Sequence, residues 1–535
     1  MRTEPSQRRG GRRARRGALT LASVAAVGSL CAGCGGTSTA AITTAVHASR
    51  AASLSPTTLT GPTTSTPATA RADVQVGTPA PVAPTSAAQG FVGIATELST
   101  ITHLSGSATH QNGAFVQLLR NLSPGSPLLL RLGGDSSDWS WWAVPGMAKP
   151  RAIRYTITPQ WAAAVKSLLQ AVGGKAILGV NLELDSPRVA AYEAREYERT
   201  LGPQLIDALE LGNEPELYAA FNYYRLPDGR GVKGRVFGHY TIADYGRDFS
   251  HIAAGLGSDP IAGPSSGSPT WLPQLGSLLN GLPSRLKLVT VHAYPLKRCS
   301  ASTHLNVSDF FTGASIGGLA GSVAHMAAAA RAHHKPLRVD EINGISCGGE
   351  AGVSNTFAEA LWALNVLPAL WRAGAEGVNF QTVNGNLNEM ISATDTRAGW
   401  RIGVQPEYFG LLTFADVAPA GSRLLQVRAP AVSGQYAYAV RDTSHVDRVV
   451  ITNITRGART VTVSAAGATG TGAVSLLTAP SLTATGDTTL GGQKLSAATG
   501  QLIGHPHDTL VKPNAAGVYA VRVPAHSAVI LTVNS

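Results

Sequence analysis

The chain has 535 residues, 44% of them hydrophobic, which is enough for more than one domain with a substantial core. Its formal net charge of +11 is concentrated at the start, where residues 1–33 hold seven Arg and one Glu; the remaining 36 basic and 31 acidic residues nearly balance. That remainder has no basic stripe with interleaved aromatic residues, which argues against nucleic acid as a partner. A weak attraction to anionic glycans or lipids stays open.

Residues 1–34 have the pattern of an export signal. The arginine pairs Arg12-Arg13 and Arg15-Arg16 precede the apolar run Ala18–Leu30, which is too short for a permanent transmembrane helix. Arg15-Arg16-Gly-Ala-Leu resembles a twin-arginine signal. Leu30-Cys31-Ala-Gly-Cys34 resembles a bacterial lipobox with Cys34 as the lipidated residue, although Cys31 stands where an aliphatic residue is usual. We therefore predict an exported protein, anchored by lipid to the outer face of the cell membrane or, if the signal is an ordinary cleaved one, secreted.

Residues 35–86 are rich in Ser, Thr, Pro and Ala and poor in large apolar residues. Such a segment cannot bury enough surface to fold alone, so it is interpreted as a tether of coil and polyproline-like character. Its last part, within residues 72–82, contains the alternating stretch Ala72-Asp-Val-Gln-Val-Gly. This stretch is predicted to be a strand that joins another domain.

Residues 87–420 alternate short apolar runs with helix-like segments. Helices are predicted at Pro159–Val172, Ile242–Leu256, Ile316–His333 and Thr356–Ala373. Strands are predicted at Phe91–Glu97, Leu128–Leu132, Ala176–Asn181, Leu205–Leu211, Pro260–Gly263, Leu286–His292, Leu337–Asp340 and Gly377–Gln381. Eight strands alternating with helices favour an α/β fold, a closed (β/α)8 TIM barrel. An open doubly wound sheet would need a phosphate-binding glycine loop, and Leu132-Gly133-Gly134-Asp135 does not match that fingerprint.

Residues 421–535 change in texture to short β-type runs separated by Gly, Asn and Asp. Examples are Val449-Val-Ile-Thr, Thr460-Val-Thr-Val-Ser, Ala473-Val-Ser-Leu-Leu and Ala528-Val-Ile-Leu-Thr-Val. This pattern predicts an all-β sandwich. Because few aromatic residues fall on recognisable faces, a structural domain packed on the barrel is favoured over a carbohydrate-binding one.

Polar residues gather at the carboxyl ends of the predicted strands, which in a barrel ring a single mouth. Two glutamates lead this set: Glu214 follows the strand at Leu205–Leu211, and Glu341 follows the strand at Leu337–Asp340. Two carboxyl groups facing each other are the minimum equipment for splitting a glycosidic bond. The other members of the set are Glu97, Arg131, Asp135, Asn181, Asn213, His292, Tyr294, Asn343 and Gln381.

Each glutamate is assigned a role by the chemistry. Glu214 is the predicted general acid/base, because the departing alkoxide must be protonated. Glu341 is the predicted nucleophile and must stay ionised, for which Arg131 and the Tyr294 hydroxyl are suitable donors. Asn213 is predicted to bond the sugar 2-hydroxyl. The alternative for Glu214 is a simple charge at a helix start, since the following proline suits a first helical turn.

Several polar and aromatic residues are interpreted as structural. Glu210 alternates with apolar neighbours, and Asp340 alternates away from Glu341, so an ion pair behind the sheet is expected for Asp340. Trp139, Trp141 and Trp142 either stack on sugar rings or cover their loop.

Two cysteines are predicted to form a disulfide rather than a metal site. Cys299 and Cys347 each lie a few residues beyond a strand end, so they are predicted to form a disulfide between two active-site loops, with two free thiols as the alternative. No metal or cofactor is expected, because two cysteines without spaced histidines do not make a zinc site.

The chain resembles retaining glycoside hydrolases of the large barrel clan and, more narrowly, glycoside hydrolase family 79, the heparanase and β-glucuronidase family. The matching text covers the whole barrel: Leu130-Arg-Leu-Gly-Gly-Asp-Ser-Ser-Asp138, Leu211-Gly-Asn-Glu-Pro215, Val291-His-Ala-Tyr-Pro295, Glu341-Ile-Asn-Gly, Cys347-Gly-Gly, Gly352-Val-Ser-Asn-Thr-Phe-Ala-Glu-Ala-Leu-Trp362 and Gly377-Val-Asn-Phe380. Members also carry a C-terminal β-domain.

The resemblance implies metal-free hydrolysis in two displacements, with Glu214 at the acid/base position, Glu341 at the nucleophile position, and Asn213 and Tyr294 supporting them. It implies a β-glucuronidase-like exo-enzyme acting on a carbohydrate, with no obligate protein partner. Two departures concern the sugar: residues 341–400 contain no Tyr, and Gln381 stands where similar sequences often have His.

Other readings stay open beside this one. A β-glucosidase or β-xylosidase and an envelope transglycosidase would use the same scaffold. A catalytically silent, lipid-anchored glycan-binding protein is the alternative from another class, although such a protein has no need to retain both glutamates.

Overall fold

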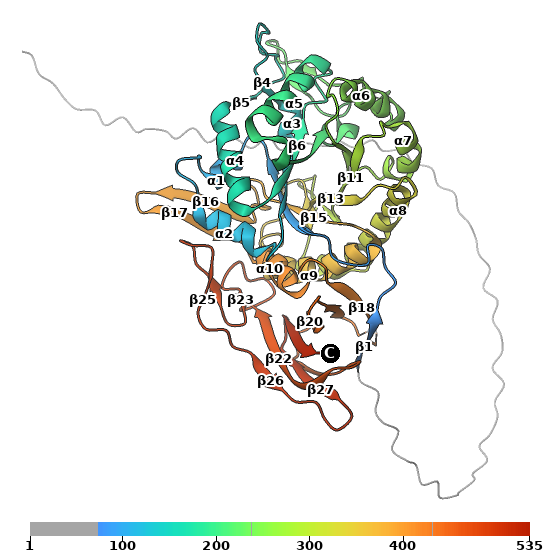
Figure 1. Ribbon diagram of the computed structural model, residues 1–535, viewed down its shortest axis with the longest axis vertical. Coiled ribbons are helices and arrows are strands. Elements are labelled where there is room, and N and C mark those ends of the chain that lie inside the picture. Colours follow the sequence, from blue (N-terminus) through green and yellow to red (C-terminus); the bar gives the residue numbers. More distant parts are fainter. Residues whose placement is uncertain (1–72, 237, 431) are drawn as a thin grey trace, which may run out of the picture. The chain divides into compact units, whose positions relative to one another are not determined.

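The computed structural model describes residues 73–236, 238–430 and 432–535 (Figure 1). The predicted export signal, the lipobox with Cys34 and most of the predicted tether lie outside these residues. No helix among the described residues has the length and apolar character that a bilayer-spanning segment requires.

Eight parallel strands close into a barrel, which confirms the predicted fold class. Neighbouring strands pair in chain order, and the last strand pairs with the first. The strands are β2 (Val92–Glu97), β3 (Leu129–Gly133), β6 (Lys175–Val180), β7 (Ile206–Leu211), β10 (Ile261–Ser266), β11 (Leu286–Ala293), β13 (Leu337–Ile342) and β15 (Val378–Gln381). Each predicted strand is present, and β13 runs two residues further than expected, so that Glu341 lies inside it.

Helices surround the barrel and follow local sequence signals (Figure 1). Helix α4 begins at Pro159, behind an N-cap in which the Thr158 side chain accepts from the Trp161 amide, and it ends before Gly173 at φ 65°. The predicted helix at 316–333 opens as a π-helical turn, with α8 following. The helices are α1 (Ile101–Ser105), α2 (Gly113–Asn121), α3 (Ser136–Trp139), α4 (Pro159–Val172), α5 (Pro187–Leu201), α6 (Ile242–Ala254), α7 (Leu275–Gly281), α8 (Leu319–Ala332), α9 (Phe357–Ala373) and α10 (Pro406–Val417).

The barrel interior has an apolar floor beneath a polar upper part. Small and medium apolar side chains form the floor: Ile177, Ala208, Ala262 and Leu288. Above it, the two-residue alternation of β7 sends Leu209 and Leu211 to the helices and Glu210 inward. The charged part of the interior therefore lies directly below the mouth formed by the strand ends.

The C-terminal domain is one long sheet that folds over on itself. Its strands are β18 (Arg423–Arg428), β19 (Gln435–Arg441), β20 (Val446–Asn453), β21 (Arg459–Ala465), β22 (Thr469–Thr478), β23 (Thr489–Leu490), β26 (Thr509–Val511), β27 (Val518–Val523) and β28 (Ser527–Asn534). Strand β1 (Val74–Pro79) enters this sheet, antiparallel to β18 and parallel to β21. Residues from both parts of the folded sheet share one apolar core, as in a sandwich.

The sheet presents its second face to the barrel. On β20, Val449 and Ile451 point into the sandwich core, while Val450 packs into the core shared with the barrel. Helices α9 and α10 lie between barrel and sheet and are buried on nearly all sides. The domain therefore covers apolar helix surface that would otherwise face water.

Removing β1 should destabilise the sandwich, because β18 and β21 would each lose a strand partner and Val74 and Val76 would leave the core. We expect a chain that begins at residue 80 to unfold several degrees lower than one that begins at residue 73, in thermal unfolding followed by circular dichroism. The chain beginning at residue 73 is the matched control, since it keeps every strand of the sheet. Equal midpoints for the two chains would contradict this role of β1.

Candidate active site

Glu214 sits on a tight turn just beyond β7. Gly212, at φ 79°, makes this turn possible, because a Cβ there would lie 2.2 Å from the Tyr218 hydroxyl. Glu214 itself has φ 44° and donates its amide to the Ser265 carbonyl at 2.9 Å. Although Pro215 opens a short 3-10 helix, the Glu214 side chain makes no capping bond to it. The side chain points instead to the His292 ring, so a helix-start charge does not describe its position.

Glu341 projects into the mouth because β13 shifts register. Val291 pairs with Val339 and the next residue, His292, pairs with Glu341, so one residue of β13 is skipped. The shift lets Asp340 and Glu341 approach the same arginine, at 3.6 and 2.6 Å. The prediction that Asp340 points behind the sheet is therefore wrong: its side chain is fully buried beside Arg131 inside the barrel.

Arg131 is the centre of the site. Its guanidinium has no exposed surface and donates from Nη1 to Glu341 Oε2 at 2.6 Å and from Nε to Glu210 Oε2 at 2.8 Å. Its Nη2 donates to Asn213 Oδ1 at 2.7 Å and to Ser265 Oγ at 3.0 Å. A buried guanidinium with these partners holds side chains from the ends of three other strands in one arrangement.

Tyr294 and His292 complete the surroundings of Glu341. The Tyr294 hydroxyl donates to Glu341 Oε1 at 2.8 Å. Burial alone would raise the pKa of Glu341, but His292, Arg131 and Tyr294 outweigh burial and leave that pKa below its usual value. Glu341 is therefore an ionised carboxylate near neutral pH, the state that a nucleophile requires.

His292 lies between the two glutamates. Its Nδ1 is 3.0 Å from Glu214 Oε1 and 3.8 Å from Glu341 Oε1, and its Nε2 is 3.0 Å from Ser265 Oγ. Burial would lower the pKa of His292, but Glu341 and the hydrogen bond to Glu214 raise it to about 10. The ring is therefore a cation at neutral pH and donates to both Glu214 and Ser265.

The two carboxyl groups are close together. One oxygen of Glu214, one oxygen of Glu341 and one ring nitrogen of His292 all lie within 4.8 Å of one another. Three such groups offer the geometry of a cation site. The positive charge between the carboxylates is already supplied by protonated His292 and Arg131, so a metal ion would have to displace the histidine proton.

Other predicted site residues occupy the same mouth. Asn213 is buried; besides accepting from Arg131, it donates from Nδ2 to the exposed Asp135 at 3.1 Å. Glu97 accepts from the Ser136 amide at 2.7 Å, and its pKa is raised by burial.

The last strand ends contribute two buried amides. Asn343 donates to the Gln381 carbonyl at 2.8 Å, and the side-chain oxygens of both residues have no donor among the described residues. Asn181 is different, because it bonds the backbone of Asp138, Ser140 and Leu184. It shapes a loop and does not contact the two glutamates.

The tryptophans of the loop after β3 mostly cover that loop. Trp141 and Trp142 are buried, at 3% and 4% exposure, and Trp142 packs edge-on against Tyr197. Trp139 is half-buried under the Arg154 guanidinium. Trp141 and Trp142 therefore cover their loop, which was one of the two roles predicted for them beside stacking on sugar rings.

Sequence reasoning overlooked three side chains that organise the site. Ser265, at φ 52°, bonds both Arg131 and His292. Asp138 accepts from the Asn213 amide at 2.9 Å and from the Tyr218 hydroxyl at 2.8 Å, which fixes the turn carrying Glu214. The position of Ser265, just after a predicted strand, was the available signal; nothing local in the sequence distinguishes Asp138 or Tyr218.

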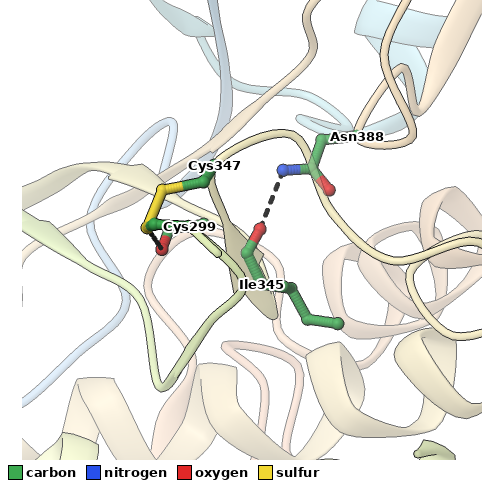
Figure 2. Close-up of a disulfide and its surroundings, with 5 residues drawn as sticks. Cys299, Ile345, Cys347 and Asn388 are labelled. Atoms are coloured by element: carbon green, nitrogen blue, oxygen red, sulfur yellow. Dashed lines mark hydrogen bonds between the residues drawn. A yellow bond between two sulfur atoms is a disulfide. The ribbon is translucent and has the colours of Figure 1, made fainter. Parts of the chain in front are cut away.

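A disulfide joins the loops that follow β11 and β13. Cys299 and Cys347 are bonded, and the adjoining strands β12 (Leu296–Lys297) and β14 (Ile345–Ser346) pair in parallel. Figure 2 shows the neighbouring contact, in which Asn388 donates to the Ile345 carbonyl at 2.9 Å. The loops leaving Tyr294 and Glu341 are thus tied to each other and to the loop after β15.

Comparison with known proteins gives a family assignment for the C-terminal domain. Residues 437–530 match the glycosyl hydrolase family 79 C-terminal beta domain. The chain carries a family 79 domain. This confirms the resemblance drawn from the barrel motifs and indicates a glycoside hydrolase with a carbohydrate substrate. No curated protein matches the sequence.

Solved structures agree with the architecture. A 4-O-α-L-rhamnosyl-β-D-glucuronidase from Fusarium oxysporum aligns over 86% of this chain and 99% of its own, with a TM-score of 0.66 and 20% identity. A family 51 arabinofuranosidase from Xanthomonas axonopodis aligns over 87% and 100%, with a TM-score of 0.59 and 16% identity. An α-L-arabinofuranosidase from Thermotoga maritima aligns over 87% of this chain and 100% of its own, with a TM-score of 0.56 and 13% identity. At these identities, the similarity establishes a shared fold.

The disulfide should contribute to stability, because it closes a loop across a sequence separation of 48 residues. We expect the Cys299→Ser, Cys347→Ser double variant to lose about 2–4 kcal/mol of unfolding free energy in denaturant titrations.

Thiol labelling tests the bond directly. A chain beginning at residue 73 contains only these two cysteines. Its mass should increase by two labels after denaturation with reductant and by none after denaturation without it. Two labels without reductant would show free thiols.

Proposed function

We propose that the protein is a retaining β-glycosidase that acts by double displacement, with Glu341 as nucleophile and Glu214 as general acid/base. The single observation that carries this proposal is the close approach of the two carboxyl groups, one oxygen of each lying within 4.8 Å of the other. Retaining enzymes hold their carboxyl groups about 5–5.5 Å apart, whereas inverting enzymes need about 6.5–9.5 Å to admit a water molecule.

In the first step, ionised Glu341 attacks the anomeric carbon while the bond to the leaving oxygen breaks and Glu214 gives that oxygen its proton. Protonated His292, at 3.0 Å, stabilises the carboxylate that Glu214 then becomes. Arg131 and Tyr294 hold the Glu341 carboxylate from two sides, so it is aimed by two donors before substrate enters.

In the second step, water attacks the glycosyl-enzyme ester, and Glu214 takes up the water proton while the bond to Glu341 breaks. Both steps use the same two carboxyl groups, and the sugar leaves with its original anomeric configuration. Asn213 is placed between Arg131 and Asp135, where its amide can hydrogen-bond a sugar hydroxyl.

For the sugar itself we favour a β-glucuronide. The disulfide-bound loop contains Cys347, Gly348 and Gly349 in succession at φ 59°, 86° and 83°, and a turn can present successive backbone amides to an anion. A uronate carboxylate is an anion of suitable size for such a turn. The fold is also shared with a solved glucuronidase. A neutral glycone is the competing choice, supported by the absence of Tyr from residues 341–400.

Two further outcomes share this scaffold. A transglycosidase would form the same ester and pass the sugar to a second sugar in place of water, so product analysis with an added acceptor sugar separates it from a hydrolase. A silent glycan-binding protein would bind sugar without turnover. Export and lipid anchoring at Cys34 remain part of the proposal, supported by the sequence of residues 1–34.

Glu341→Ala should lower turnover by several orders of magnitude while leaving the fold intact, because it removes the nucleophile. We would measure nitrophenol release from aryl β-glucuronide, glucoside, xyloside and galactoside, and follow the anomeric proton of the first-formed sugar by NMR. Wild-type activity with retention, lost in the variant, is expected.

Glu389 is half-exposed, and the Glu389→Ala variant is the matched control, which should keep activity. Wild-type rates in Glu341→Ala, or an inverted product, would overturn the mechanism. Turnover of the glucoside but not of the glucuronide would overturn only the proposal that the sugar is a glucuronide.

Tyr294→Phe should move the acidic limb of the pH profile of kcat/KM upward by roughly one pH unit, because the lost hydrogen bond stabilises the ionised form of Glu341. The sign follows from the lowered pKa of Glu341: removing a donor raises that pKa, so activity is lost at higher pH during acidification. Tyr192→Phe, on the outer helix α5, is the control. An unchanged limb in Tyr294→Phe would show that the hydrogen bond does not tune Glu341.

A further inference from the structure

Two buried acids lie beneath the nucleophile and take no part in the proposed reaction. Asp340 on β13 and Glu210 on β7 have side chains with no exposed surface. Both approach the same nitrogen, Arg131 Nε, with Glu210 Oε2 at 2.8 Å and Asp340 Oδ2 at 3.6 Å. Two carboxyl groups therefore meet at a single N–H that can satisfy only one of them well.

The other charged donors nearby are already used. Arg131 directs Nη1 to Glu341 and Nη2 to Asn213 and Ser265. On β11, His292 faces Ser265 and Glu214.

One further cation belongs to β13 itself. Arg338 donates to Asn379 and to the Gly90 carbonyl. In the described part of the chain, three carboxyl oxygens have no hydrogen-bond donor: both oxygens of Asp340 and Oε1 of Glu210. The Thr290 hydroxyl is also without a partner there.

Two ionised carboxylates in this dry interior would repel each other and leave three oxygens unpaired, which is costly. A single proton between them removes the repulsion and supplies the missing donor. The surroundings favour placing it on Asp340. Burial and the Glu210 charge raise the pKa of Asp340 well above its usual value, whereas for Glu210 the effect of burial is outweighed by Arg131 and the pKa is lowered.

We propose that Asp340 and Glu210 hold one proton between them, with Asp340 as the neutral acid that donates to Glu210, so that the pair carries one negative charge. Arg131 then pairs with two anions, Glu210 and Glu341, and the Glu341 carboxylate does not compete with a third anion. Asp340 and Glu210 are positioning residues, since they act through Arg131. The effect on turnover rests on the proposed function, but the location of the proton does not.

The test is a double-mutant cycle of Asp340→Asn, Glu210→Gln and the combined variant, with Asp207→Asn as the control. Asp207 lies on β7 as well, but it pairs with Lys287 at the surface. Asn copies a neutral acid that donates, so Asp340→Asn should keep kcat/KM within about threefold and leave the acidic limb in place. In Glu210→Gln, Asp340 can ionise and take over the charge. The combined variant leaves no anion at Arg131 Nε and should lose at least about 100-fold in kcat/KM.

Infrared difference spectra test the proton without relying on catalysis. Wild type minus Asp340→Asn at neutral pH should show the band of a protonated carboxyl group, and wild type minus Asp207→Asn should not. The combined variant should unfold at a lower temperature than either single variant.

The proposal is overturned by a missing band, by loss of more than about 30-fold in Asp340→Asn, or by a combined variant as active and stable as the single ones. If no glycoside is turned over, the glycosidase proposal fails, while the infrared and unfolding results still decide this one.

Discussion

The site depends on one buried cation. Arg131 lies inside the barrel with no exposed surface, and such a charge is tolerated only when its donors are matched by acceptors. The matching groups come from β7, β10 and β13 and from the turn after β7. Satisfying this guanidinium therefore fixes where the ends of distant strands stand relative to one another. The approach of Glu214, Glu341 and His292 to within 4.8 Å of one another is a consequence of that constraint.

Three residues with a strained backbone lie around the same place. Glu214, Ser265 and Cys347 all have positive φ, which costs about 1–3 kcal/mol for residues other than glycine. Each is held by a neighbouring contact: Glu214 by the Ser265 carbonyl, Ser265 by Arg131 and His292, and Cys347 by its disulfide. The closed barrel supplies the rigid frame that keeps these conformations in place, and in return they aim side chains that regular strands would direct elsewhere.

The C-terminal domain buries apolar helix surface of the barrel. Helices α9 and α10 are apolar around most of their circumference, because one side packs on the barrel and the other on the sheet. Residues at alternate positions of β20 serve two different cores. The match of residues 437–530 to the family 79 C-terminal beta domain therefore concerns a domain that packs against the barrel.

Much of this arrangement could be predicted from local sequence. The eight strands, the chain order of the barrel, the separate β-domain and the position of Glu214 beyond a strand all follow from periodicity and turn residues. The pairing of Cys299 with Cys347 follows from their places beyond two strand ends.

What the sequence by itself determined was which residues reach the mouth, because strand direction and the two-residue period are local properties. Which of them touch was decided only by the tertiary structure. The register shift of β13 brought both Asp340 and Glu341 to Arg131, against the alternation expected of a regular strand. Asn181 bonds a loop and Ser265 bonds His292, and neither contact follows from the local pattern of the chain. A buried charge selects its partners across the whole barrel, and that selection leaves no local trace in the chain.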